Sequence, residues 1–148
     1  MNPAIVLLAL VHSAWASSLM IWGGVRPRCS LNETKHSFTM AVYDRTNCTV
    51  ALRPWTVASV GENLQTYYEF PAFALEIIQE GDEEHGDGQF MFKSNCTESG
   101  NMETSCMKGK ILYQGMGRYV DMPINLPFPE EIAEDCDDGF VKALEDLQ

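Results

Sequence analysis

The stretch Phe38-Thr39-Met40-Ala41-Val42-Tyr43 (FTMAVY) decides the fold class that the sequence predicts. The apolar side chains of Phe38, Met40 and Val42 alternate with Thr39, Ala41 and Tyr43. A period of two is typical of a strand that buries one face. The same alternation returns at Phe90 and Phe92, within 89–93 (QFMFK). Both segments therefore predict β-strands.

Four further segments also predict strands, at 49–52, 72–79, 110–113 and 118–122. We expect Pro54 to end the first, because proline cannot donate to a sheet. Segment 72–79 (AFALEIIQ) fits a strand or a helix, and we favour a strand because Pro71 precedes it. The apolar lead-in 17–27 is broken by Gly23-Gly24.

The acidic stretch 80–88 (EGDEEHGDG) predicts a loop between two strands. It ends in Asp87-Gly88, a dipeptide typical of hairpin turns. It lacks the ligand spacing of an EF-hand, so a solvated turn is favoured over a calcium site. We expect His85 in this loop, and His36 beside a sequon, to be exposed.

The composition changes at Pro123, where a proline-rich connector leads into an acidic C-terminal segment. Phe140, Leu144 and Leu147 fall on one face of a short helix, and Asp138 is its expected cap. This helix either docks on the sheet or is a loosely held tail. We therefore predict a mainly β fold, a disulfide-bonded antiparallel β-sandwich over 17–128, followed by an acidic C-terminal helix or tail over 129–148.

Residues 1–16 predict a signal peptide. Ala4–Val11 is an uncharged apolar run, and Ala14-Trp15-Ala16 is a small-x-small cleavage pattern. The alternative is a core strand or helix at the N-terminus. The run is too short to span a bilayer, which needs about 20 residues, so no transmembrane segment is expected. The mature protein is predicted to be secreted and extracellular.

The net charge of −11 constrains the partners. A strongly acidic chain is repelled by phosphates, so nucleic acid and anionic membranes are not expected partners. A basic extracellular protein remains compatible with this charge. The hydrophobic content of 45% indicates a folded core rather than disorder.

Five cysteines cannot all pair within one chain, and the sequence does not select among the pairings. We favour Cys29–Cys48 and Cys96–Cys106, each of which closes a short loop. Cys136 would then remain as a thiol or form an intermolecular disulfide. Without a Cys-x-x-Cys pair or a histidine at ligand spacing, we expect no metal site and no cofactor.

Three Asn-x-Ser/Thr sequons begin at Asn32, Asn47 and Asn95. In a secreted chain such asparagines are candidate glycosylation sites and lie at the surface. The second and third contain a cysteine, Cys48 and Cys96.

No catalytic residue is expected. The chain contains none of the usual motifs for nucleophilic, metal-dependent or nucleotide chemistry. Its carboxylates are concentrated in acidic runs, where nothing would raise their pKa for acid catalysis. The carboxylates around Cys136 disfavour a thiolate. We therefore predict a binding protein rather than an enzyme.

The mature chain is rich in aromatic residues and in methionines, namely Met40, Met91, Met102, Met107, Met116 and Met122. They form either an ordinary sandwich core or a cavity between two sheets, in which methionine side chains adapt to an apolar ligand. The candidate lining residues are the apolar positions of three predicted strands, Phe38, Met40, Phe73, Leu75, Phe90 and Phe92.

The stretch Asn95–Tyr113 (NCTESGNMETSCMKGKILY) resembles the ML lipid-recognition domain family. In that family two cysteines about ten residues apart precede Lys-Gly and a strand with an aromatic residue. Here these positions are filled by Cys96, Cys106, Lys108, Gly109 and Tyr113. The resemblance implies a secreted immunoglobulin-like β-sandwich that holds acyl chains between its sheets.

Two functions stay open. One is a secreted non-enzymatic protein that holds a lipid or other apolar ligand between its sheets. The other is a secreted modulator, such as an immune or receptor–ligand antagonist, that binds a basic protein through an acidic surface. Added salt would weaken the second kind of binding and change the first little.

Overall fold

The computed structural model describes residues 18–31, 36–60, 66–113, 115 and 117–148. They form the strands β1 (Ser18–Cys29), β2 (His36–Asp44), β3 (Thr49–Val60), β4 (Tyr68–Glu80), β5 (Glu83–Ser94), β6 (Glu103–Leu112) and β7 (Gly117–Leu126), and the helix α2 (Asp138–Asp146). The predicted fold class, mainly β with a short C-terminal helix, is confirmed. The predicted signal peptide lies outside the described residues.

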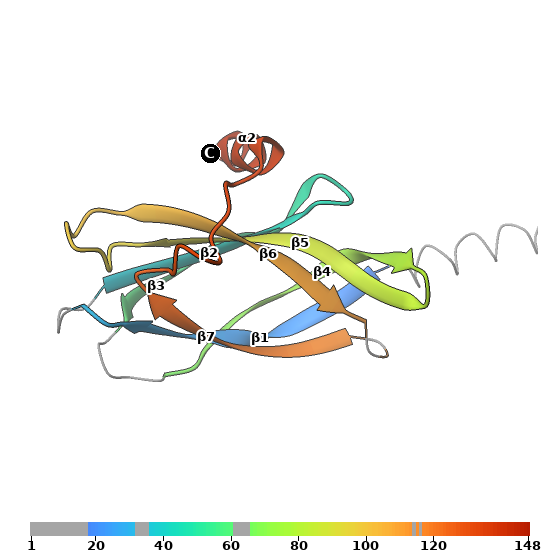
Figure 1. The fold of residues 1–148 in the computed structure, drawn as a ribbon, viewed down its shortest axis with the longest axis horizontal. Coiled ribbons are helices and arrows are strands. Elements are labelled where there is room, and N and C mark those ends of the chain that lie inside the picture. The colour runs from blue at the N-terminus through green and yellow to red at the C-terminus, as the bar shows by residue number, and fades with distance from the viewer. Residues whose placement is uncertain (1–17, 32–35, 61–65, 114, 116) are drawn as a thin grey trace, which may run out of the picture.

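The strands form two layers joined by β4 (Figure 1). One layer has the order β3-β2-β5-β6, and the other β4-β1-β7. The first part of β4 pairs with β1, and its last four residues, Ile77–Glu80, pair with β5. All pairs are antiparallel except β1 with β7, which is parallel. A parallel pair needs a long connection, and here most of the chain lies between the two strands.

The core lies between these layers and is rich in phenylalanine. Every second residue of β2 from Phe38 to Val42 is buried in it, as the alternation predicts. Segment 72–79 is part of β4, so the favoured strand is confirmed. The largest core side chains that are fully buried include Phe38, Phe92, Leu19, Ile21, Met40 and Leu75.

The apolar lead-in is a full strand rather than a broken segment. Gly23 has φ 138° and lies at a register shift in the pairing of β1 with β4. A Cβ at this position would lie 1.8 Å from the carbonyl oxygen of Val120 on β7. Glycine therefore allows β1 to bulge and still pair on both sides.

The prediction that Pro54 ends a strand is wrong, because β3 continues to Val60. Met40 pairs with Trp55 and Val42 with Leu52, so a bulge containing Pro54 lies opposite β2. Pro54 is exposed on a strand at the end of its layer. At such a position the missing donor leaves no partner unsatisfied.

The predicted hairpin turn at Asp87-Gly88 is also wrong. The turn lies at Gly81 and Asp82, where Gly81 has φ 64°, and β5 already begins at Glu83. Asp87 and Gly88 instead pair with β6. Residues 83–88 of the acidic stretch are therefore part of β5 rather than of a loop. The pairing of β5 with its neighbouring strands outweighs the turn propensity of the Asp87-Gly88 dipeptide.

The favoured disulfides are wrong as well. Cys29 is bonded to Cys96, and Cys106 to Cys136, so Cys48 is the free and exposed cysteine. Cys29 ends β1 and Cys96 follows β5, so the first disulfide links the two layers. A sandwich brings segments distant in sequence together, and spacing along the chain does not reveal these neighbours.

Helix α2 docks on the outer face of the β2-β5-β6 layer, which decides against a loosely held tail (Figure 1). The ring of Phe140 is fully buried and stacks on Tyr43, with ring centroids 5.0 Å apart. The packed cluster also contains Ala41, Met91 and Cys106. The helix therefore has its own small core outside the sandwich.

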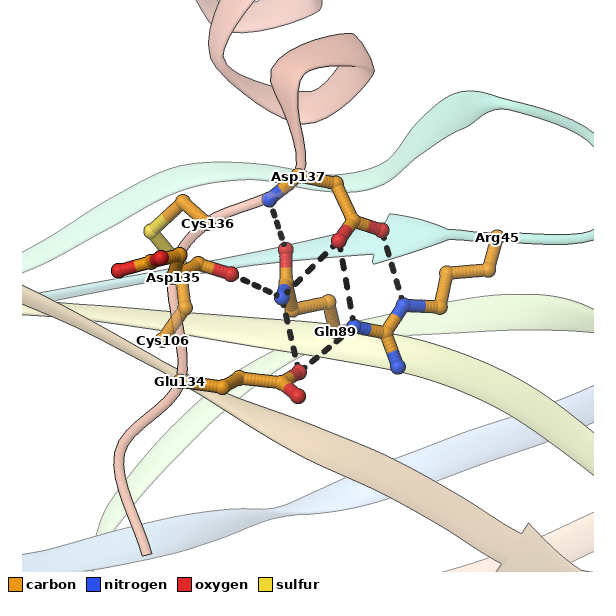
Figure 2. The surroundings of a disulfide bond; sticks show 7 residues. All are labelled: Arg45, Gln89, Cys106, Glu134, Asp135, Cys136 and Asp137. Carbon is orange, nitrogen blue, oxygen red and sulfur yellow. Dashed lines mark hydrogen bonds and ion pairs between the residues drawn. A yellow bond between two sulfur atoms is a disulfide. The ribbon is translucent and has the colours of Figure 1, made fainter.

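Polar contacts hold the segment that leads into α2 (Figure 2). The buried Gln89 amide donates to Glu134 Oε1 at 2.8 Å and to the carbonyl of Asp135 at 3.0 Å, and its oxygen accepts from the Asp137 N–H at 2.8 Å. Arg45 donates to Glu134 at 2.6 Å and to Asp137 at 2.9 Å. Part of the acidic C-terminal charge is thus neutralised within the molecule.

We expect non-reducing peptide mapping of the protein to recover the linked peptides of Cys29 with Cys96 and of Cys106 with Cys136. Only Cys48 should react with iodoacetamide before reduction. The fully reduced protein, with all five cysteines alkylated, is the control. A linked peptide of Cys29 with Cys48 would contradict this topology.

We expect Phe140→Ala to release α2, because the docking cluster loses its central ring at a cost of about 3 kcal/mol. Hydrogen exchange of the α2 amides should rise about 100-fold while the strands stay protected. The adjacent Val141→Ala, at an exposed position, is the matched control. Equal exchange in the two variants would mean that Phe140 does not hold the helix.

Candidate functional site

The six predicted lining residues lie together, but they form the packed core. Phe38, Met40, Phe73, Leu75, Phe90 and Phe92 are all buried in one cluster. Phe92 lies 5.7 Å from Phe38 and 6.3 Å from Phe90 between ring centroids, and Phe90 lies 6.4 Å from Phe73. As packed, these rings contact one another, so a ligand among them would have to displace side chains. The period-two alternation of the sequence therefore identified the core residues correctly, but it did not show whether these residues enclose a cavity.

An apolar groove of about 230 Å³ lies beside this core, between β6 and β7. Among the described strands, β5 is the partner of β6 and β1 the partner of β7, so each strand ends its layer, and β6 has in addition an isolated bridge between Cys106 and Glu134. We name this apolar groove the β6–β7 groove. It is lined by Met107, Asp121, Met122, Pro123, Ile124, Asn125, Phe128, Pro129 and Ile132.

The floor of the β6–β7 groove is continuous with the core. Ile124 is buried, and Met107, Met122 and Phe128 are partly buried against the core cluster. The ring of Phe128 lies 5.2 Å from that of Phe92. Ile132 forms an outer wall and is 53% exposed. Unbranched thioether side chains adjust their shape at small cost, so this lining can adapt to an apolar ligand.

Every residue that lines the β6–β7 groove lies between Cys106 and Cys136 in the sequence. This disulfide closes a loop across a sequence separation of 30. The backbone N–H of Glu134 also donates to the carbonyl of Cys106 at 2.8 Å. The groove is therefore the product of one covalently closed segment. The high methionine content pointed to Met107 and Met122 among the other methionines. Phe128 and Ile132 could not be found in this way, because they lie in the segments predicted to be a connector and a tail.

The polar groups beside the groove bind one another. Arg26 donates to both carboxylate oxygens of Asp121, at 3.0 and 3.2 Å, and lies 5.1 Å from the centre of the Tyr67 ring. The hydroxyls of Tyr119 and Tyr67 are hydrogen-bonded to each other at 3.0 Å, and this bond raises the pKa of Tyr67 to about 12.

The two histidines expected at the surface are buried. Among the described residues, neither ring nitrogen of His36 has a hydrogen-bond partner, and burial lowers the pKa of this imidazole. His85 lies beside Glu80 and Glu83, and one ligand atom from each of the three lies within 4.8 Å of the others. The expectation of solvated histidines is wrong because both lie on strands rather than in loops.

The candidate glycosylation sites differ in their surroundings. Asn47 is exposed in the turn between β2 and β3. Asn95 is partly buried, and its side-chain oxygen accepts from the Ser37 N–H at 2.9 Å. Asn32 lies outside the described residues. Asn47 therefore offers the more accessible amide of the two described sites.

Comparisons of the chain with family models, with curated proteins and with solved structures each found no match. Within the described residues, no helix is both long enough and apolar enough to cross a membrane.

We expect acid to destabilise the fold through His36. Its pKa is lowered by folding, so the unfolded chain binds the proton more readily below a pH of about 6.5. The free energy of unfolding is therefore highest above that pH, where the imidazole is neutral in both states, and it decreases as the pH falls. Urea unfolding at pH 7.5 and 5.5 should show a smaller difference for His36→Leu than for the unsubstituted protein. An unchanged difference would exclude His36 as a cause.

Proposed function

We propose that this chain is a secreted, non-enzymatic binding protein that holds a lipid or other apolar ligand in the β6–β7 groove. The single observation that carries the proposal is an apolar groove whose floor is the core itself, at the side where two layers end. An apolar chain in this position would bury surface against both β6 and β7, which is the main source of affinity for such ligands.

The size of the groove favours a slender ligand. Its volume of about 230 Å³ is below the roughly 300–1,000 Å³ of pockets for drug-sized molecules. A single acyl chain matches such a space better than a ring system. Movement of the methionine side chains would lengthen the groove toward the core residues that were first expected to contact the ligand.

The resemblance to ML lipid-recognition domains agrees with this proposal. The stretch that carries it, Asn95–Tyr113, contains the whole of β6 and contributes Met107 to the groove. The two cysteines of the stretch bond to different partners rather than to each other.

Two disulfides also support the secreted location. Disulfides persist in oxidising compartments and are rare in the cytosol. The exposed sequon at Asn47 is compatible with passage through the secretory pathway.

Binding of a basic protein is the second candidate, and the exposed acidic side chains at the tip of the β4–β5 hairpin favour it. Glu80, Asp82, Glu83 and Glu84 are exposed there. In each acidic region part of the charge is paired within the molecule, Glu134 and Asp137 with Arg45 and Glu83 with Lys110.

We expect a dansyl-labelled undecanoic acid to bind the secreted protein saturably, with a 1:1 stoichiometry in fluorescence titration. Ile132→Glu should weaken binding about tenfold or more, because binding would then bury a carboxylate against the chain. Val141→Glu is the matched control, since Val141 is 42% exposed and lies on α2, outside the groove.

Binding that is unchanged between 50 and 500 mM NaCl would support the apolar site. The proposal fails if the unsubstituted protein does not bind the probe, or if the two glutamate variants lose binding equally. Capture of a basic protein that is abolished by salt, without probe binding, would favour the second candidate.

A further inference from the structure

The β4–β5 hairpin brings three metal-ligating side chains together at its tip. Glu80 is the last residue of β4 and pairs across the turn with Glu83, the first residue of β5. His85 follows Glu83 by two residues on the same strand, so the two side chains lie on one face. The tight turn at Gly81 thus places two carboxylates beside one imidazole.

The distances leave room for an ion between these groups. Since an ion binds only one nitrogen of an imidazole, the relevant set is one ligand atom from each residue, and these three atoms lie within 4.8 Å of one another. Glu83 Oε1 lies 3.6 Å from His85 Nδ1, and Glu80 Oε2 lies 4.0 Å from the other ring nitrogen, Nε2. Both distances exceed those of hydrogen bonds. Ligands about 2.0–2.2 Å from a metal ion lie about 3–3.5 Å apart when they are neighbours. Small side-chain rotations would therefore complete such a site.

The state of His85 is an independent observation that points to a ligand. This residue is only 6% exposed, and its buried Nδ1 has no hydrogen-bond partner among the described residues. A buried polar atom without a partner costs about 1–3 kcal/mol, and native structures seldom retain one without a reason. An ion bound to the imidazole would supply the missing partner.

We propose that Glu80, Glu83 and His85 bind a divalent transition-metal ion at the tip of the β4–β5 hairpin. One imidazole with two carboxylates suits Zn²⁺ better than Mg²⁺ or Ca²⁺, which prefer oxygen ligands alone. Asp82, Glu83 and Glu84 line an open hollow with Leu112 and Tyr113. Of the three proposed ligands, Glu83 lines this hollow, so water has access to its carboxylate from that side.

Lys110 on β6 opposes the ion. Its ammonium group forms an ion pair with Glu83. A metal ion must therefore share this carboxylate with a cation. Removal of the Lys110 ammonium group should therefore strengthen metal binding. If Glu83 served only the ion pair with Lys110, removal of that ammonium group would not affect the binding of metal.

The test is calorimetric titration of ZnCl₂ at pH 7.5 into the full secreted protein, treated with a chelator and then dialysed. All variants carry Cys48→Ser, so the free thiol does not contribute. We expect one site per chain. Glu80→Gln should weaken it about tenfold or more. Because Glu80 is 76% exposed on its side chain, the fold should not change.

Glu84→Gln removes a neighbouring carboxylate outside the group and is the matched control, expected to bind as the parent does. Lys110→Met should bind severalfold more tightly. In NMR spectra of the imidazole nitrogens, Zn²⁺ should shift the His85 resonances and leave those of His36 unchanged. The proposal is overturned if the parent does not bind Zn²⁺, if Glu80→Gln and Glu84→Gln weaken binding equally, or if the His85 ring does not respond.

Discussion

The shared pairing of β4 is the constraint on which the rest of the structure depends. Its first part is hydrogen-bonded to β1 and its last four residues to β5, so one strand closes one side of the sandwich. The opposite side is formed by β6 and β7, which end their layers. The phenylalanine core is enclosed on the first side and reaches the surface on the second, where the β6–β7 groove lies. The same strand ends at the acidic hairpin tip, so both proposed sites follow from its path.

Much of the fold could be predicted from local patterns, because burial of one face imposes a period of two on the sequence. Phe38 to Val42 and Phe90 with Phe92 were recognised in this way, whereas Ala72 to Gln79 also fitted a helix and was assigned to a strand because of Pro71 before it. The errors concern residues whose role is fixed by distant neighbours. Pro54 is tolerated because it lies in a bulge on a strand at the end of a layer, and Asp87-Gly88 is held straight by β6. Cys29 finds Cys96 only after the layers have assembled.

The candidate site was harder to predict than the fold for a related reason. Alternation indicates which side chains point inward, but a filled interior and a cavity require the same residues. The six core positions therefore lie in the right region, while the groove depends on Phe128 and Ile132, in a segment without strand periodicity. The burial of His85 was missed because its sequence neighbours are charged, whereas its spatial neighbours come from strands on both sides.

The Cys106–Cys136 loop has a consequence for engineering. All side chains of the β6–β7 groove are encoded by codons 107 to 132, although the rest of the sandwich is assembled from the entire chain. One short synthetic cassette would therefore randomise the complete lining, while β2, β4, β5 and the other disulfide keep their native sequence. The groove could be diversified in a display library in a single cloning step, much as one hypervariable loop is diversified on an antibody framework.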